Sequence, residues 1–316
     1  MEVIGIDTRM IERIARILSR HSNAVKPLDV FDEKYYPSKD MDRETTLRYF
    51  LVMVAMDHRL SRPGKPYEAC LEDGCYHGAD LLYRLGKKKL DENPEFFSPE
   101  TLSKITIEDV VKWLRVGNAE PPDPEVRAYL LRDLGVKLLK LYNGSAESLI
   151  ESSKNRVRGS GVSPGLTDLL RVFRAYEDPA EKKPLLLIKF LKARGLFNPV
   201  DHVDIPVDNH LSRIAYRLGI VMVSGRLWDK IKSGAGVTRE EDILLRMHIR
   251  RAYRILAEKA NIDLFLLDDY LWDMGRRICI RDTPYCDKCL FKNVCLARNN
   301  PKFVVNEHVF YNTWYY

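Results

Sequence analysis

Hydrophobic residues recur at helical spacing along most of the chain. In residues 11–18 the apolar positions fall on one face of a helix, and residues 47–56 are apolar on nearly every side, as in a buried helix. Residues 130–141 are again amphipathic, and the Asn143-Gly144 pair that follows them is a typical helix stop. Each of these segments therefore predicts a helix.

Strand-like alternation is scarce by comparison. The best candidates for strands are residues 303–305 and 309–311, near the end of the sequence. Proline-rich breaks at 61–66 and 120–125 separate the helical segments. We therefore expect an all-α protein.

Length and composition set broad limits on the architecture and the partners. A chain of 316 residues with 45% hydrophobic content fits two lobes with ordinary cores. The net charge of +6 permits a polyanionic partner, but a solvated basic surface without a partner explains it equally well. The sequence has no glutamine and many Glu, Lys and Arg residues, which is a thermophile tendency.

No stretch approaches the roughly 20 apolar residues of a transmembrane helix, and the first residues lack the layout of a signal peptide. We therefore expect a cytoplasmic protein without membrane contact. Thiols stay reduced in that compartment, so the six cysteines favour metal chemistry or buried packing over disulfides. Cys70 and Cys75 have no second pair nearby, and we interpret them as buried or incidental thiols.

Four cysteines lie close together near the end of the chain. Cys279, Cys286, Cys289 and Cys295 are spaced C-x6-C-x2-C-x5-C. Thiolates at such uneven intervals can surround a compact cluster, whereas zinc sites more often pair two short C-x2-C motifs across a longer gap. By ligand count and spacing alone, an iron–sulfur cluster and a zinc site are about equally favoured, ahead of four unligated thiols.

The same motif carries a resemblance to a known family. The spacing, preceded by a helix that ends in Gly275-Arg276-Arg277, resembles the [4Fe–4S] loop of endonuclease III and related adenine glycosylases. Leu290 departs from the family, which often has Pro after the third cysteine. The resemblance implies a two-lobed helix-hairpin-helix glycosylase fold whose C-terminal loop holds a [4Fe–4S] cofactor on the four cysteines.

The resemblance also implies a DNA-binding role for basic residues around that loop. Such residues would contact phosphates and position the protein without reading the base sequence. They could equally offset the negative charge of a thiolate-ligated cluster. His58 and Arg59 lie roughly where relatives keep a residue that is inserted into DNA. The expected DNA-binding residues are Arg276, Arg277, Arg281, Lys288, His58 and Arg59.

An aspartate upstream of the cysteines fits the same family. The segment Pro206-Val207-Asp208-x-His210 is extended and ends at a residue suited to cap a helix that would stop at Gly219. It is similar to the Val-Asp-Thr-His segment of endonuclease III relatives, in which the Asp is catalytic. The resemblance therefore assigns a catalytic role to Asp208.

A lysine pair lies further upstream, in the expected hairpin. Residues 166–176 predict an amphipathic helix, and Asp178-Pro179 resembles a helix start that places Lys182 in the first turn, although Pro184 should kink the helix soon afterwards. The hairpin lacks the glycines of endonuclease III and resembles the archaeal 8-oxoguanine glycosylase branch. On that match Lys182 is the nucleophile, with Lys183 as the alternative.

These residue types suit the cleavage of an N-glycosidic bond. A carboxylate stabilises the oxocarbenium-like sugar, and a neutral amine can attack C1′ and form a Schiff base, from which β-elimination nicks the strand. Taken alone, Asp208 is a plain helix cap and Lys182 a solvated helix start. Their order along the chain before the cysteine motif favours the catalytic interpretation.

We therefore expect a DNA base-excision repair N-glycosylase with AP lyase activity on a damaged, oxidised base, acting as a monomer on double-stranded DNA. One alternative is a monofunctional glycosylase that uses Asp208 and water. The other is a non-catalytic, or RNA- or nucleoside-directed, iron–sulfur relative, which the missing hairpin glycines favour.

The expected domain organisation follows from the same features. An N-terminal helix that packs on the cluster lobe occupies residues 1–40, and a helical domain with the hairpin occupies 41–200. The cluster-bearing helical domain spans 201–300, and an aromatic tail spans 301–316. The long interval between Asp208 and Cys279 predicts an inserted helix within 228–260.

Overall fold

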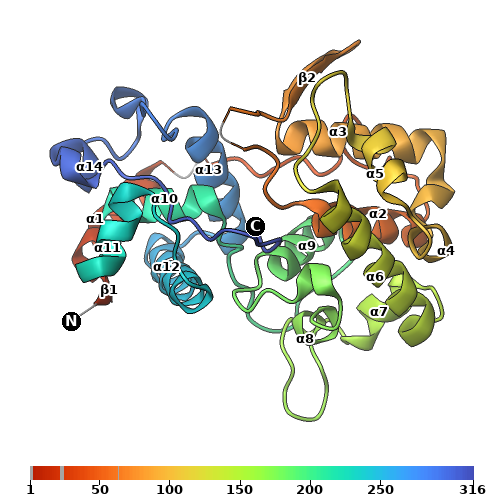
Figure 1. Cartoon of the computed structure of the whole chain (residues 1–316). Coiled ribbons are helices and arrows are strands. Elements are labelled where there is room, and N and C mark those ends of the chain that lie inside the picture. The colour runs from red at the N-terminus through yellow and green to blue at the C-terminus, as the bar shows by residue number, and fades with distance from the viewer. Residues whose placement is uncertain (1–2, 22–24, 63) are drawn as a thin grey trace. The chain divides into compact units, whose positions relative to one another are not determined.

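Helices make up most of the computed structural model, which describes residues 3–21, 25–62 and 64–316 (Figure 1). The prediction of a mainly helical protein is confirmed. The chain divides into two units: unit 1 comprises Met1–Leu28 and Asp204–Thr313, and unit 2 comprises Asp29–Val203 and Trp314–Tyr316. Each unit is described by itself below.

Unit 2 is built around α2 (Arg43–Met56), which Asp42 caps by accepting a hydrogen bond from the backbone of Thr45. Ten of its residues are buried because neighbouring helices cover it on several sides, as the all-round apolar sequence predicts. Its neighbours α3, α6, α7 and α9 pack against it. The helices of unit 2 after α2 are α3 (Ala79–Glu92), η2 (Pro94–Phe97), α4 (Pro99–Leu102), α5 (Ile107–Leu114), α6 (Pro124–Tyr142), α7 (Ala146–Ser152), α8 (Leu166–Leu170), η3 (Arg174–Tyr176) and α9 (Lys182–Ala193).

Unit 1 joins the N-terminal helix to the C-terminal third of the chain. Helix α1 (Thr8–Arg20) packs its apolar stripe on α12 (Arg239–Ala260), and β1 (Ile4–Ile6) pairs antiparallel with β4 (Val221–Val223). Helix α10 (Asn209–Leu218) ends at Gly219, whose positive φ of 79° suits glycine. The other helices are α11 (Gly225–Ser233), α13 (Leu264–Arg277), η4 (Cys286–Lys288), α14 (Leu296–Asn299) and η5 (Pro301–Phe303).

Several local expectations were wrong. Residues 303–305 do not form a strand, and 309–311 contribute only an isolated bridge between Val309 and Gly236. The segment 166–176 is not one helix but α8 followed by η3. Pro184 does not kink α9, because it lies in the first turn, where a helix needs no partner for the missing N–H.

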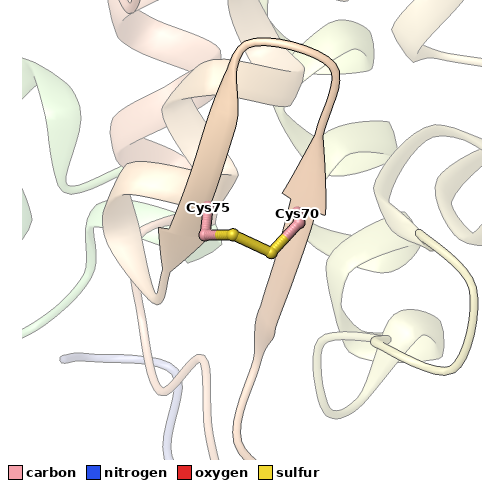
Figure 2. The surroundings of a disulfide bond; sticks show 2 residues. All are labelled: Cys70 and Cys75. Atoms are coloured by element: carbon pink, nitrogen blue, oxygen red, sulfur yellow. A yellow bond between two sulfur atoms is a disulfide. The ribbon is translucent and has the colours of Figure 1, made fainter.

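The expectation of buried or incidental thiols at Cys70 and Cys75 was also wrong. The two residues face each other across the antiparallel hairpin of β2 (Glu68–Leu71) and β3 (Gly74–His77), and a disulfide joins them (Figure 2). Both residues are exposed. The Asp73-Gly74 dipeptide is a hairpin signal that could have placed the two cysteines opposite each other.

A buried polar network holds the core of unit 1 together. Asp242 on α12 pairs with Arg246 at 2.6 Å and with Nε2 of His308 at 3.0 Å, and Nδ1 of His308 lies 2.8 Å from the hydroxyl of Tyr216. Burial alone would raise the pKa of Asp242, but His308 and Arg246 outweigh it and lower the pKa from 3.8 to about 2. The network therefore ties α10 and α12 to the C-terminal segment. In the part of the chain that the structure describes, no helix combines the length and apolar character needed to span a membrane.

The lowered pKa of Asp242 predicts how unit 1 responds to acid. Its folded pKa lies below the unfolded value, so the stabilisation is present above about pH 4 and is lost as the pH falls towards 2. The shift corresponds to about 2 kcal/mol. Urea unfolding at a series of pH values should show this loss in the wild type, and Asp242→Asn should remove it while also lowering stability at neutral pH.

The exposed Asp229, which pairs only with Lys232 on its own helix, provides the control substitution. Asp229→Asn should leave the acid transition unchanged. An Asp242→Asn protein that kept the same acid transition would show that another carboxylate controls it.

Candidate functional site

The lysine pair opens α9 in unit 2, after a tight turn. Asp178 is fully buried, and its carboxylate accepts hydrogen bonds from the backbone N–H groups of Ala180 and Lys182, both at 2.9 Å. Glu181 has a left-handed φ of 56°, and Arg158 holds its carboxylate with two hydrogen bonds of 2.8 and 2.7 Å. The Asp178 segment is thus a turn that precedes the helix, and Lys182 is the first helical residue.

Lys182 is directed at a single acidic residue. Its ammonium donates to the backbone carbonyl of Asp57 at 2.9 Å and lies 3.5 Å from the carboxylate of the same residue. The side chain of Lys182 is 8% exposed and that of Asp57 is 18% exposed. Both side chains therefore lie at the edge of the core rather than fully inside it.

Lys183 lies deeper than its neighbour and is fully buried. Its amine donates to the carbonyl of Ala55 at 2.6 Å and lies 3.2 Å from Nδ1 of His58. Burial and the charge of Lys182 hold the pKa of Lys183 well below its ordinary value, and burial with the charge of Arg127 does the same for the pKa of His58. In both groups the surroundings thus favour the neutral form.

Arg127 on α6 closes the back of this cluster. Its buried guanidinium donates to the carbonyls of Met56, His58 and Arg59, and burial lowers its pKa to about 10. At this pKa the guanidinium stays charged at neutral pH, and it places positive charge beside Lys183 and His58. Nε2 of His58 is buried and has no hydrogen-bond partner in the part of the chain that the structure describes.

Part of this cluster was not predicted from the sequence. Lys182 and Lys183 were predicted, but Arg127 was not, because in the sequence it is an ordinary basic residue of a helix and only the fold buries it. The Arg158–Glu181 pair was not predicted either, since the left-handed backbone at Glu181 depends on the fold.

Asp208 lies in unit 1, at the start of α10. As expected from the sequence, it caps this helix: one carboxylate oxygen accepts from the backbone of Leu211 at 2.9 Å, and the other lies 3.0 Å from Nδ1 of His210. Its side chain is 16% exposed. Gly275 on α13 packs against His210, and an added Cβ would approach the His210 Cβ to 2.8 Å. The glycine before the cysteine motif therefore lets α13 approach the histidine that orients Asp208.

Two arginines of α10 hold the start of the cysteine loop. Arg213 donates to the carbonyls of Gly275 and Cys279 and pairs with Glu307 at 2.9 Å. Arg217 donates to the carbonyls of Ile280 and Val305, and one of its N–H groups lies 3.4 Å from Sγ of Cys279. The backbone path of the cysteine loop is thus held by α10, the helix that Asp208 caps.

The four cysteines of the loop share one cavity, lined by Cys279, Cys286, Cys289 and Cys295 together with apolar and basic residues. Burial, with a smaller contribution from the other three cysteines, raises the pKa of the Cys289 thiol to about 11. The donor set and the shared cavity fit a thiolate-ligated cluster. Within residues 3–21, 25–62 and 64–316, no group of His, Cys, Asp and Glu side chains forms a site for a single metal ion.

The basic residues expected to bind DNA have contacts within their own unit. Arg276 lies over the ring of Trp272, Arg277 pairs with Asp273, Arg281 with Glu307, and Lys288 lies over Tyr285. His58 is only 4% exposed, because Arg127 and Lys183 hold it in the core of unit 2, and it cannot be inserted into DNA from there. The backbone N–H of Arg59 donates to Tyr316.

Comparison with known proteins points to nucleotide salvage. A family model described as "Queuosine salvage protein" matches residues 36–183, a segment that contains Asp57, His58, Arg127 and the lysine pair. A "Queuosine 5'-phosphate N-glycosylase/hydrolase" of Dictyostelium discoideum is 23% identical over 77% of this chain and 76% of its own length. A protein of the same name from Sphaerobacter thermophilus is 23% identical over 77% of this chain and 80% of its own.

The fold is similar to that of endonuclease III. A solved structure of a trapped endonuclease III–DNA covalent intermediate superposes with a TM-score of 0.50, covering 93% of this chain and 96% of the other at 14% identity. This likeness shows a similar path of the chain and nothing about activity.

The expected activity on DNA was wrong. The relatives are named for a free nucleotide, which contradicts a DNA repair enzyme with lyase activity and damaged double-stranded DNA as its partner. Two sets of expected roles depended on activity on DNA and are withdrawn with it. They are the Schiff-base roles of Lys182 and Lys183 and the DNA-binding roles of Arg276, Arg277, Arg281, Lys288, His58 and Arg59. The sequence is similar instead to N-glycosylases that act by hydrolysis.

Proposed function

We propose that the protein hydrolyses the N-glycosidic bond of queuosine 5′-phosphate, with Lys182 of unit 2 as a catalytic residue. A catalytic role for Asp208 of unit 1 is a separate proposal. The observation that carries the proposal is the family match over residues 36–183, which ends at the buried lysine pair and contains the residues that surround it. This proposal develops one of the alternatives that the sequence left open, that of a nucleoside-directed relative.

The reaction needs a stabilised sugar cation and a protonated leaving group. The C1′–N bond breaks with its electron pair going to the base, water adds its oxygen at C1′, and the base gains a proton. The Asp208 carboxylate keeps lone pairs beyond its bonds to Leu211 and His210, so it can oppose positive charge on the sugar and accept a proton from water.

Lys182 has the N–H donors that protonation of the leaving base requires. An ammonium has three N–H donors, and two of them are directed at Asp57. The third is left for a bound ligand, to which it can donate a hydrogen bond or a proton. Lys183 is too deeply buried to touch a substrate, so we assign it the role of holding Ala55 and His58 behind Lys182.

We also propose that Cys279, Cys286, Cys289 and Cys295 hold a [4Fe–4S] cluster. The shared cavity and the four free thiols support this assignment. Such a cluster would crosslink the loop and fix the backbone that Arg213 and Arg217 bind, and through α10 it would steady Asp208.

Substitution of either catalytic residue should remove base release. Asp208→Asn keeps the size of the side chain but removes the charge, and Lys182→Met keeps the aliphatic stem but removes the donor. Each should lower kcat for queuosine 5′-phosphate by about a hundredfold or more. Release of the free base, followed by chromatography with mass detection, measures the effect.

Exposed residues of the same types serve as controls for these substitutions. Asp229→Asn and Lys88→Met should stay within about twofold of the wild type, because both lie exposed on other helices. Full activity of Asp208→Asn or Lys182→Met would remove that residue from the mechanism. A folded wild-type protein that releases no base would contradict the proposed function itself.

The cluster assignment predicts the metal content of the full chain. Protein purified without oxygen should be brown and contain about four iron and four sulfide per chain. Cys289→Ser should lower the iron content, whereas Cys70→Ser should leave it unchanged, since Cys70 pairs with Cys75 in unit 2. One zinc per chain and no iron would favour the zinc interpretation of the same cysteines.

A further inference from the structure

The last three described residues are aromatic and belong to a different unit from the segment before them. Residues up to Thr313 belong to unit 1, but Trp314–Tyr316 belong to unit 2. In unit 2 the indole N–H of Trp314 donates to the carbonyl of Arg174 at 2.8 Å, and the backbone oxygen of Tyr316 accepts from the N–H of Arg59 at 3.3 Å. Tyr315 is only 8% exposed and Tyr316 only 4%. We call these three residues the tail.

The segment that leads to the tail is firmly held in unit 1. Glu307 pairs with Arg213, and His308 lies in the buried network with Asp242. Val309 accepts a backbone hydrogen bond from Val237 at 2.8 Å. Val309 is thus fixed in unit 1 only five positions before Trp314, the first residue of the tail.

The tail completes the loop that holds Lys182. In residues 57–59 every backbone polar group has a partner within unit 2. The N–H groups of Asp57 and His58 bond to Val54 and Met56, and that of Arg59 bonds to Tyr316. The carbonyl of Asp57 accepts from Lys182, and those of His58 and Arg59 accept from Arg127.

This arrangement bears on how large a substrate the site accepts. Proteins hold the backbone of a nucleic acid through basic side chains and main-chain N–H groups. The loop beside Lys182 has no main-chain N–H left for a phosphate, and the tail covers the N–H that would otherwise be exposed at Arg59. A single nucleotide does not need this surface, whereas a strand that continues past the reacting nucleotide does.

We propose that the tail is a specificity determinant that restricts the lysine site to free nucleotides and excludes the same nucleotide within a strand. This inference rests on the proposed function, which supplies the reaction. The tail acts by occupying the surface next to Asp57–Arg59, so releasing it opens that surface, while the bond of Lys182 to Asp57 does not itself involve the tail.

The test compares two substrates across tail variants. Tyr316→Ala removes a buried ring that anchors the tail, and Trp314→Phe removes the donor to Arg174 but keeps an aromatic ring. The matched control is Tyr311→Ala, because Tyr311 is 54% exposed and precedes the tail. The substrates are queuosine 5′-phosphate and a trinucleotide with queuosine in the middle, and the readout is the ratio of their kcat/KM values.

The wild type should prefer the free nucleotide by about a hundredfold or more, and Tyr316→Ala should reduce that preference by about tenfold or more. Trp314→Phe should have a smaller effect, and Tyr311→Ala none. A parallel loss of activity on both substrates would overturn the proposal, because it would show that the tail only supports the fold. Equal use of both substrates by the wild type would overturn it as well.

A binding measurement separates this proposal from the proposed function. Fluorescence anisotropy with the labelled trinucleotide should show about fivefold or more tighter binding to Tyr316→Ala and Trp314→Phe than to the wild type, whether or not base is released. Unchanged binding by both variants, with native far-ultraviolet circular dichroism, would overturn the role of the tail. Absence of wild-type activity on the free nucleotide would contradict the proposed function alone.

Discussion

The structure of the candidate site depends on the removal of two adjacent lysines from water at the start of α9. Both side chains enter the core of unit 2, where an ammonium without partners is costly. Unit 2 resolves this differently for each lysine. Lys182 lies beside the carbonyl and carboxylate of Asp57, and Lys183 lies among groups that favour its neutral form. The turn at Asp178, the left-handed Glu181 and the guanidinium of Arg127 all serve to hold this arrangement.

The burial of the lysine pair also explains why a fold like that of endonuclease III need not carry the activity of endonuclease III. The likeness to endonuclease III concerns the path of the chain, whereas the residues around Lys182 determine what can be bound. His58, which a DNA-acting relative would present to its substrate, is instead buried and held by Lys183 and Arg127. The expectation of a DNA repair enzyme came from the cysteine motif and from the order of Lys182 and Asp208 before it. The correction follows the family match over the segment that carries these buried residues.

Helical periodicity predicted much of the fold because most helices bury one apolar face or are buried on all sides. Helix α2, the cap at Asp208 and the stop at Gly219 were all predicted from residue types alone. The break between α8 and η3 and the turn before Lys182 were not, because they depend on side chains from distant segments, such as Asp133, which accepts a hydrogen bond from the backbone of Arg174. The disulfide was missed because an assumption about compartment outweighed the Asp73-Gly74 hairpin signal.

The candidate residues were identified by motif, but their chemistry was not. Sequence spacing singled out Lys182, Lys183 and Asp208 without showing that Lys183 is fully buried, since burial depends on the fold. The most direct test of this account is a titration of the lysine side chains by carbon-13 NMR in the folded protein, with Lys183→Met to assign the signal. The account predicts that Lys183 titrates well below the ordinary range of lysine. A Lys183 signal that titrates near pH 10 would contradict it.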